Sequence, residues 1–334
     1  MSKHVQAVAK EELMDYPTYN DILAARAVVG RYLPRTPTYP SPGLSTLVGG
    51  ELFVKHENHL PIGAFKVRGG VNFMASLSPA DKQRGVITAT RGNHGLSVAY
   101  AARLFGAKAV LVVPRGNNPD KNAGMVALGA EVVEYGRDFD EAREHVAALV
   151  AAHGYRYLHP ANEPLLIAGV GTYALELFAD VPNLDVVIVP IGLGSGICGV
   201  SLVRERISPK TRVIGVQAER APAVYLSWKE KRMITTDGAD TFADGLATRV
   251  PAEMTQAIIN RAVDEIVTVS EEEMAVAIRL LLFHTHNLAE GAGAASLAAA
   301  LKLRAQLAGK RIAVILSGGN IDAATLRRVL SNEG

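Results

Sequence analysis

Short apolar runs alternate along the chain with longer segments of mixed polarity. The runs are "GVITAT", "KAVLVVP", "AEVVEYG", "DVVIVPIG", "TRVIGVQAE" and "KRIAVILSGG". They are almost continuously apolar rather than alternating between apolar and polar, which is typical of parallel strands covered on both faces. The pattern predicts an α/β chain, doubly wound, with helices on both faces of open, mostly parallel sheets.

Helices are expected between these strands, over residues 93–105, 138–153, 163–179 and 293–307. Ser270 and Glu273 fit a capping box that opens a further helix. Three strand–helix units fall between about residues 85 and 160, and another set begins at residue 185. This spacing predicts a smaller domain over residues 81–160, inserted into a larger domain formed by residues 1–80 and 161–334.

One segment without charges, "VVIVPIGLGSGICGVSLV", has 18 residues and approaches the length of a membrane span. Pro190 and four glycines within it favour instead a buried strand, a tight loop and a helix. No second segment of this kind accompanies it, so we expect no association with a membrane.

Composition narrows the class of protein. A length of 334 residues favours about two domains. The 35 basic and 33 acidic residues nearly balance, which gives no electrostatic reason to expect a nucleic-acid partner. Cys198 is the single cysteine, so no intrachain disulfide can form and a reducing, cytoplasmic location is expected. The segment 1–20 mixes charges and lacks an apolar core, so no signal peptide is expected.

The segment "PIGAFKVRGG" places Lys66 after small residues and before Arg68 and a pair of glycines. It can be a solvated helix start. Alternatively, a lysine amine in such a turn can form a Schiff base with a carbonyl compound and later move a proton.

Two loops that follow strands are rich in glycine. "RGNHG", from Arg91 to Gly95, can offer backbone N–H groups to a carboxylate or phosphate at a helix N-terminus, or be an ordinary turn capped by Asn93. "GLGSG", from Gly192 to Gly196, is a candidate phosphate-binding turn.

The second loop also carries a dinucleotide-binding pattern. Gly194, Gly196 and Gly199 form a literal G-x-G-x-x-G, and Glu219 ends the next strand, where a ribose-binding acid would lie. An NAD(P)-dependent oxidoreductase is therefore an alternative. That pattern usually opens its domain, however, and it leaves Lys66 unexplained.

Two further polar residues follow or interrupt apolar segments. Ser317, just after a strand, can share a hydrogen bond with a heterocyclic nitrogen or belong to a simple turn. Glu290 is either a structural cap or the partner of a polar ring substituent. A reactive lysine, a phosphate turn, an anion-binding loop and a neutral serine together suit pyridoxal 5′-phosphate (PLP), an electron sink for carbanions at an amino acid's Cα.

Six motifs occur in order: "KHENHLPIGAFKVRGG", "TATRGNHGLSVAYAARLFGAKAVLVVP", "VPIGLGSGICG", "TFADGLA", "LAEGAGAAS" and "ILSGGNID". Together the chain resembles the threonine/serine dehydratase and serine racemase group of the tryptophan-synthase-β-like, fold-type II PLP enzymes. The resemblance implies that Lys66 binds the cofactor as an imine, that Phe65 packs beside the ring, that Asn93 bonds the ring hydroxyl and that Ser317 faces the pyridine nitrogen. It also implies a phosphate site at Gly192, Leu193, Gly194 and Ser195 with Gly196 beside them, and a substrate-carboxylate loop formed by Thr90, Arg91, Gly92, Asn93 and His94.

The function that follows is β-elimination. The resemblance implies that Lys66, freed by the substrate amine, removes the Cα proton, and that the products are a 2-oxo acid and ammonia. L-Threonine or L-serine is the default substrate, and 3-hydroxyaspartate or a 3-aryl serine is the alternative within the class. An amino-acid-binding module without activity is a third possibility. A homodimer is expected from the resemblance. So is a division into a large PLP-binding domain, residues 1–80 and 161–334, and a small, mobile domain, residues 81–160, that closes over the substrate.

The sequence departs from the group at several positions. Arg91 replaces a serine that acts as acid and base in the racemases, and an arginine stays protonated, which argues against racemisation. Arg91 could instead bind a substrate carboxylate or point to solvent. Gln217 and Ala223 stand where metal-activated relatives carry acids, so we expect no metal. The chain ends at Gly334, so we expect no C-terminal regulatory domain and no end-product feedback through one.

Overall fold

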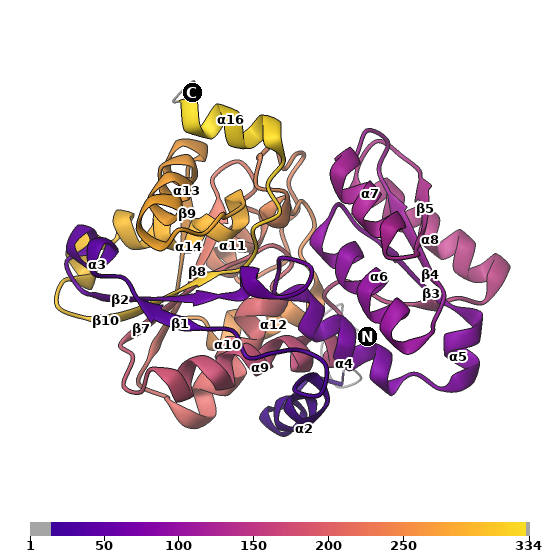
Figure 1. Ribbon diagram of the computed structural model, residues 1–334, viewed down its shortest axis with the longest axis horizontal. Coiled ribbons are helices and arrows are strands. Elements are labelled where there is room, and N and C mark those ends of the chain that lie inside the picture. The colour runs from indigo at the N-terminus through magenta and orange to yellow at the C-terminus, as the bar shows by residue number, and fades with distance from the viewer. Residues whose placement is uncertain (1–14, 332–334) are drawn as a thin grey trace, which may run out of the picture.

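The computed structural model describes residues 15–331. Most of the segment in which we expected no signal peptide lies outside these residues. The described chain forms two mostly parallel sheets, each covered by helices, that lie side by side (Figure 1). The predicted fold class is confirmed.

The larger sheet has six strands in the order β1-β2-β10-β7-β8-β9. Its neighbours are parallel except for β1 and β2, which pair antiparallel. The strands are β1 (Thr38–Pro40), β2 (Glu51–His56), β7 (Val186–Pro190), β8 (Arg212–Ala218), β9 (Glu265–Val269) and β10 (Arg311–Leu316).

The smaller sheet has four strands in the order β5-β4-β3-β6, all parallel. These strands are β3 (Val86–Ala89), β4 (Ala109–Val113), β5 (Glu131–Glu134) and β6 (Arg156–Tyr157). The six predicted strands are therefore β3, β4, β5, β7, β8 and β10. The sequence prediction did not include β1, β2, β6 and β9.

The helices agree with the prediction where it was made. Residues 93–105 form a helix with the predicted bounds, and the predicted 293–307 helix begins earlier and divides at Leu303, which leaves the α-helical region. The capping box is confirmed, because Ser270 Oγ accepts from the Glu273 amide and the Ser270 amide donates to the Glu273 carboxylate. The helices are α2 (Tyr19–Val29), α3 (Pro42–Val48), η1 (Glu57–His59), α4 (Lys66–Ser76), α5 (Pro79–Arg84), α6 (Asn93–Phe105), α7 (Pro119–Ala127), α8 (Phe139–His153), α9 (Pro164–Asp180), α10 (Ser195–Ile207), α11 (Ala223–Glu230), η2 (Asp244–Leu246), α12 (Glu253–Ala262), α13 (Glu271–Thr285), α14 (Gly291–Lys302), α15 (Arg304–Leu307) and α16 (Ala323–Ser331).

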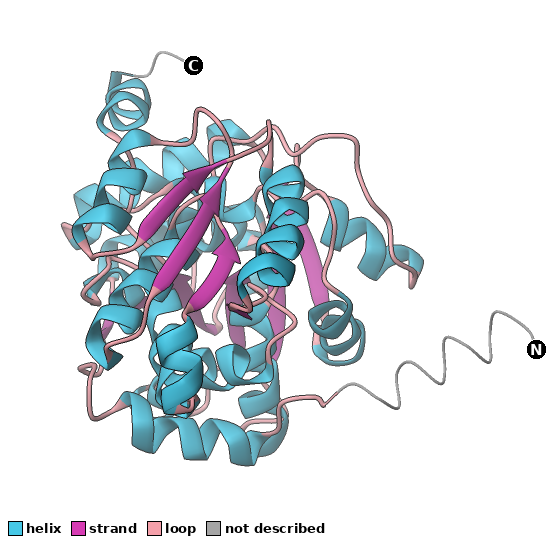
Figure 2. Cartoon of the chain, turned by 90° about the vertical axis from the view of Figure 1, so that its right-hand side faces the viewer, coloured by secondary structure: helices cyan, strands magenta, loops and turns pink. Residues whose placement is uncertain are grey.

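Both faces of the larger sheet are buried, which explains its continuous apolar strands. Val187 and Val189 pack into a core that includes residues of α9 and α10, whereas Val186 and Ile188 pack into a second core with α13 and α14. Successive side chains of a strand point to opposite faces, so each strand needs apolar residues at every position. Figure 2 shows helices on either side of the strands.

The uncharged segment 186–203 forms β7, a loop and the start of α10, as predicted. No helix within residues 15–331 is long and apolar enough to cross a membrane.

Helix α4, which begins at Lys66, lies between the two sheets and packs on α6 of one part and α9 of the other (Figure 1). Its glycine pair makes both contacts close. A Cβ at Gly69 would lie 2.8 Å from the carbonyl oxygen of Leu166, and a Cβ at Gly70 would collide with Ser97. The two glycines therefore let one helix touch both neighbours.

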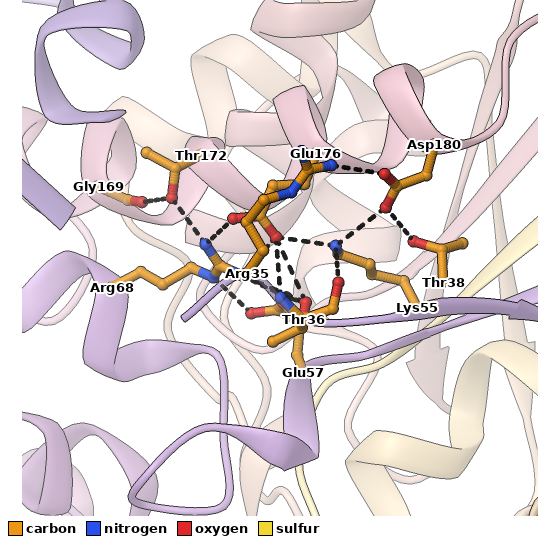
Figure 3. A network of polar contacts seen from close by, with 10 residues as sticks. All are labelled: Arg35, Thr36, Thr38, Lys55, Glu57, Arg68, Gly169, Thr172, Glu176 and Asp180. Atoms are coloured by element: carbon orange, nitrogen blue, oxygen red, sulfur yellow. Dashed lines mark hydrogen bonds and ion pairs between the residues drawn. The ribbon is translucent and has the colours of Figure 1, made fainter. Parts of the chain in front are cut away.

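The first turn of α4 is anchored by Arg68 in a buried cluster of charged side chains (Figure 3). Arg68 Nε and Nη2 lie 2.7 Å and 2.9 Å from the two carboxylate oxygens of Glu57. Arg68 Nη1 and Nη2 both lie 2.8 Å from the carboxylate of Glu176 on α9. Lys55 Nζ contacts the same Glu176 carboxylate at 2.9 Å. Each charge is thus paired, as buried charges must be.

We expect Arg68→Met to lower the free energy of unfolding by about 3–5 kcal/mol, because it leaves two carboxylates without their shared partner. Arg84→Met is the matched control: the Arg84 side chain is 58% exposed and its pairing with Asp81 is local, so a change below about 1 kcal/mol is expected. Thermal unfolding of the variants at one scan rate measures the difference. Equal shifts in both variants would contradict the anchoring role of Arg68.

Candidate active site

A cavity of about 480 Å³ opens between the two sheets. It lies at the carboxyl ends of parallel strands, where ligands bind in open α/β sheets. The cavity brings together every residue that the sequence predicted for the site: Phe65, Lys66, Thr90, Arg91, Gly92, Asn93, His94, Gly192, Leu193, Gly194, Ser195, Gly196, Glu290 and Ser317.

Lys66 is the first residue of α4 and its amine lies inside this cavity. Lys66 Nζ donates a hydrogen bond to Ser195 Oγ at 2.9 Å. No ion pair joins the amine to a carboxylate within residues 15–331. Burial without a counter-ion disfavours the charged form and lowers the pKa of Lys66 to about 8. Lys66 is therefore an amine of the cavity rather than a solvated surface charge.

The loop after β7 presents backbone donors to the cavity. Within the described chain, the N–H groups of residues 192–196 donate to no other group. Gly194 has a φ of +99°, which favours glycine, and a Cβ at Gly192 would collide with the carbonyl oxygen of Gly245. Free amides in a tight turn at the start of α10 fit a phosphate.

Three segments are joined around Phe65. The Phe65 amide donates to the carbonyl oxygen of Ser317 at 3.0 Å, which ties the turn before α4 to the end of β10. The Phe65 ring meets Tyr173 edge-on, with centroids 6.2 Å apart. Tyr173 in turn donates to the carbonyl oxygen of Gly196 at 3.1 Å. Sequence reasoning missed Tyr173, because nothing in an apolar helix marks it as a neighbour of this turn.

The loop after β3 has a capping arrangement that the sequence did not predict. Thr90 Oγ1 accepts hydrogen bonds from the amides of Gly92 and Gly95, at 3.1 Å and 2.8 Å. The interpretation of Asn93 as the cap is wrong, because Gly92 is the N-cap and Asn93 starts the helix. The amides of Asn93 and His94 donate to no described residue and remain free for an anion.

His94 is buried, and its Nε2 lies 3.1 Å from Thr88 Oγ1. Burial, and secondarily the nearby Lys66 charge, holds the pKa of His94 well below its usual value. This shift favours the neutral imidazole, so the groups of this loop that can receive an anion are its free backbone amides.

Asn93 and Glu290 form a polar pair across the cavity. Asn93 Nδ2 donates to Glu290 Oε1 at 2.5 Å, and Asn93 Oδ1 accepts from Asn320 at 2.7 Å. Glu290 occupies the N-cap position of α14, but its side chain makes no capping hydrogen bond. Burial raises the pKa of Glu290. The side chain therefore serves the cavity rather than the helix end.

Arg91 does not point freely into solvent. Its Nη2 lies 3.2 Å from Asp244 Oδ1, and Lys121 Nζ lies 2.7 Å from Asp244 Oδ2. Sequence reasoning missed both Asp244 and Lys121. The motif "TFADGLA", which contains Asp244, was a signal that could have been followed further.

Two of the features proposed for a dinucleotide, Gly199 and Glu219, lie outside the cavity, whereas Gly194 and Gly196 line it. Gly199 packs against α9, where its added Cβ would lie 2.7 Å from the Cα of Gly171. Glu219 pairs with Lys302 at 3.1 Å. Neither Gly199 nor Glu219 lines the cavity. The third glycine of the pattern is therefore explained by helix packing.

Gln217 donates to the carbonyl oxygen of Ile191 and accepts from the amide of Tyr225. Among the described residues, no group of three or more His, Cys, Asp or Glu side chains is arranged to hold a metal ion.

The chain is similar to curated and solved proteins over most of its length. It is 40% identical over 314 residues to an L-threonine ammonia-lyase of Thermotoga maritima, covering 94% of this chain and 78% of the relative. It is 38% identical over 309 residues to a beta-hydroxyaspartate dehydratase of Paracoccus denitrificans, covering 92% and 98%. The structure of maize serine racemase superposes with a TM-score of 0.89 at 30% identity, covering 96% of this chain and 98% of the other. That of threonine deaminase isoform 2 from Solanum lycopersicum gives 0.87 at 30% identity, covering 96% and 97%.

The sequence model of the family described as "Pyridoxal-phosphate dependent enzyme" matches residues 30–318. This range includes every residue of the cavity named above. By this match and by the similarity of its relatives, the chain belongs to the family of pyridoxal-phosphate-dependent enzymes.

Proposed function

We propose that this protein is a PLP-dependent ammonia-lyase that dehydrates a β-hydroxy-α-amino acid, by default L-threonine or L-serine, to a 2-oxo acid and ammonia. The observation that carries the proposal is the amine of Lys66, which lies in the cavity without a counter-ion and beside a turn of free backbone amides.

The residues of the cavity fit the cofactor. An ammonium group without a counter-ion is costly to bury, and an aldehyde bound to Lys66 as an imine would replace that ammonium group. The free amides of Gly192–Ser195 would hold the phosphate, with Gly196 beside them, and the aromatic ring of Phe65 would lie next to the cofactor. Asn93, held by Glu290, would bond the ring hydroxyl, and the hydroxyl of Ser317 would meet the ring nitrogen without imposing a charge.

When bound, PLP supplies an aldehyde for the substrate amine and a ring that accepts electron density from Cα. Residues of the chain transfer protons and orient the substrate. Lys66, with its pKa lowered to about 8, takes the proton from Cα. The free amides of Asn93 and His94 hold the substrate carboxylate, and the other residues of the loop from Thr90 to His94 shape this site. A neutral partner at the ring nitrogen favours prompt loss of the β-hydroxyl.

A second substrate, 3-hydroxyaspartate, is favoured by Arg91. Its guanidinium lines the cavity and can bind a second carboxylate. The relatives from Paracoccus denitrificans and Saccharomyces cerevisiae are named for hydroxyaspartate, and this chain covers 98% of each.

We also propose that residues 81–160 form a domain that closes over the substrate. The support is that all four strands of the smaller sheet lie within residues 86–157, and that ion pairs such as Arg249 with Asp140 join this part to the rest at the cavity. A homodimer and a cytoplasmic location remain part of the proposal, the latter supported by the single, buried Cys198.

The function is tested by measuring 2-oxo acid and ammonia with a panel of β-hydroxy amino acids. Lys66→Ala is expected to lower kcat/KM on the order of 10³-fold or more, because the proton acceptor is lost. Borohydride reduction followed by peptide mass spectrometry should find the cofactor on Lys66 of the unaltered protein. Lys229→Ala, at an exposed position, is the control and should retain activity. A Lys66→Ala variant with full turnover would eliminate the lysine assignment.

The lowered pKa of Lys66 predicts selective labelling of the cofactor-free protein. Reductive methylation at Lys66 should rise as pH passes through about 8, since only the neutral amine reacts. Lys121 in the same cavity is an internal control: burial alone would lower its pKa, but the carboxylates of Glu290 and Asp244 outweigh burial and raise it. Lys121 should therefore react only at higher pH. Mass spectrometry of the two peptides measures the extent of methylation at each lysine as a function of pH. If both lysines are methylated over the same pH range, the pKa assignment is contradicted.

The variant Arg91→Gln tests whether Arg91 binds the second carboxylate of an acidic substrate. Loss of a charged hydrogen bond predicts a decrease of roughly 10-fold or more in kcat/KM for L-threo-3-hydroxyaspartate, with less than about a threefold change for L-threonine. Arg103→Gln, on the exposed side of α6, is the matched control. Equal decreases in kcat/KM for the two substrates would contradict a contact between Arg91 and the second carboxylate.

A further inference from the structure

Asp244 lies between two cations that come from the other side of the cavity. It begins η2, in the long segment between α11 and α12, and its two oxygens contact different partners. Oδ1 lies 3.2 Å from Arg91 Nη2, and Oδ2 lies 2.7 Å from Lys121 Nζ. Arg91 follows β3 and Lys121 lies on α7, so one carboxylate of the larger part binds two cations of the smaller part.

The two cations are not held equally. The Lys121 side chain is 9% exposed and lies against Gly92, where an added Cβ would come within 2.8 Å of the Lys121 Cδ. The Arg91 side chain is 39% exposed, and its Nε is buried without a hydrogen-bond partner among the described residues. Arg91 therefore retains donors that a ligand carboxylate can use, whereas Lys121 is committed to Asp244.

Arg91 and Lys121 share one carboxylate, because each contacts a different oxygen of Asp244. Glu290 also stabilises the charge of Lys121, whereas Asp244 is the carboxylate that contacts Arg91 among the described residues. A substrate with one carboxylate leaves the contact between Arg91 and Asp244 intact. A substrate with a second carboxylate needs the same guanidinium, so Asp244 and the substrate compete for it.

We propose that Asp244 is a specificity-determining residue that acts as a built-in competitor for the second carboxylate of an acidic hydroxy-amino acid. By occupying Arg91, it limits the affinity for dicarboxylic substrates without a matching effect on monocarboxylic ones. This inference rests on the proposed dehydratase function, and it identifies the residue that balances the two substrate classes.

A role of Asp244 in joining the two parts of the molecule can be separated from this competition. Arg249 also joins them, because its Nη2 lies 3.1 Å from Asp140 and 3.4 Å from Asp138. Arg249→Gln removes a contact of this kind and leaves Arg91 paired with Asp244. If Asp244 acts only by joining the two parts, Arg249→Gln and Asp244→Asn should each change kcat/KM for the two substrates by the same factor.

The test compares selectivity, defined as kcat/KM for L-threo-3-hydroxyaspartate divided by kcat/KM for L-threonine, in the holoenzyme. Asp244→Asn should raise this ratio on the order of fivefold, the size expected for a partly exposed ion pair. Arg249→Gln should leave the ratio unchanged. In an Arg91→Gln background, Asp244→Asn should have no further effect, because the competition acts through Arg91.

Binding of an unreactive diacid gives a readout that does not depend on turnover. Calorimetric titration of the holoenzyme with succinate should show tighter binding to Asp244→Asn by a similar factor, while binding of butyrate changes little. An unchanged ratio together with unchanged succinate binding would overturn the inference. So would an equal effect of Asp244→Asn in the presence and absence of Arg91. If the unaltered protein forms no 2-oxo acid from either substrate, the proposed function fails, whereas the succinate titration still tests Asp244.

Discussion

The anchoring of Arg68 sets the position of Lys66, and the chemistry of the cavity depends on that position. The guanidinium is shared between Glu57, next to β2, and Glu176 on α9, so two elements far apart in sequence restrain one helical turn. Because Lys66 lies two residues earlier on the same turn, α4 cannot slide or rotate without breaking buried charge pairs, which is expensive. The backbone of Lys66 is therefore held in place, and its amine reaches the cavity from a fixed helix start.

Close backbone approach is the second requirement, and glycine meets it where the site is built. A Cβ at Gly192 would collide with Gly245, and a Cβ at Gly293 would collide with Gly318. These contacts bring the loops after β7 and β10 together with η2 and α14, so the turn over residues 192–196 offers backbone amides rather than long side chains to the cavity. A fixed array of amides binds an anion without the entropy cost of ordering lysine or arginine side chains.

The sequence predicts what is local and misses what depends on distant contacts. Strands β7 and β8 were recognisable because burial on both faces makes them apolar throughout, and Lys66 stood out because its turn is short and rich in small residues. Strand β2 was missed because "ELFVKH" contains Lys55, a charge that is buried only because Glu176 of α9 meets it. Asp244 was missed because its contact with Lys121 joins residues 123 positions apart. The motif that contains Asp244 was visible in the sequence, but its partner on α7 was not.

The cavity holds two lysines whose different behaviour follows from the placement of carboxylates. Lys121 contacts Asp244 and interacts electrostatically with Glu290, so its ammonium form is stabilised despite burial. Lys66 also lies in the cavity, but its hydrogen-bond partner is the neutral hydroxyl of Ser195, so nothing offsets the cost of its charge. Desolvation therefore lowers the pKa of Lys66, whereas the carboxylates near Lys121 raise its pKa. A carboxylate placed next to Lys66 would stabilise its ammonium form, as Asp244 does for Lys121, and would remove this distinction.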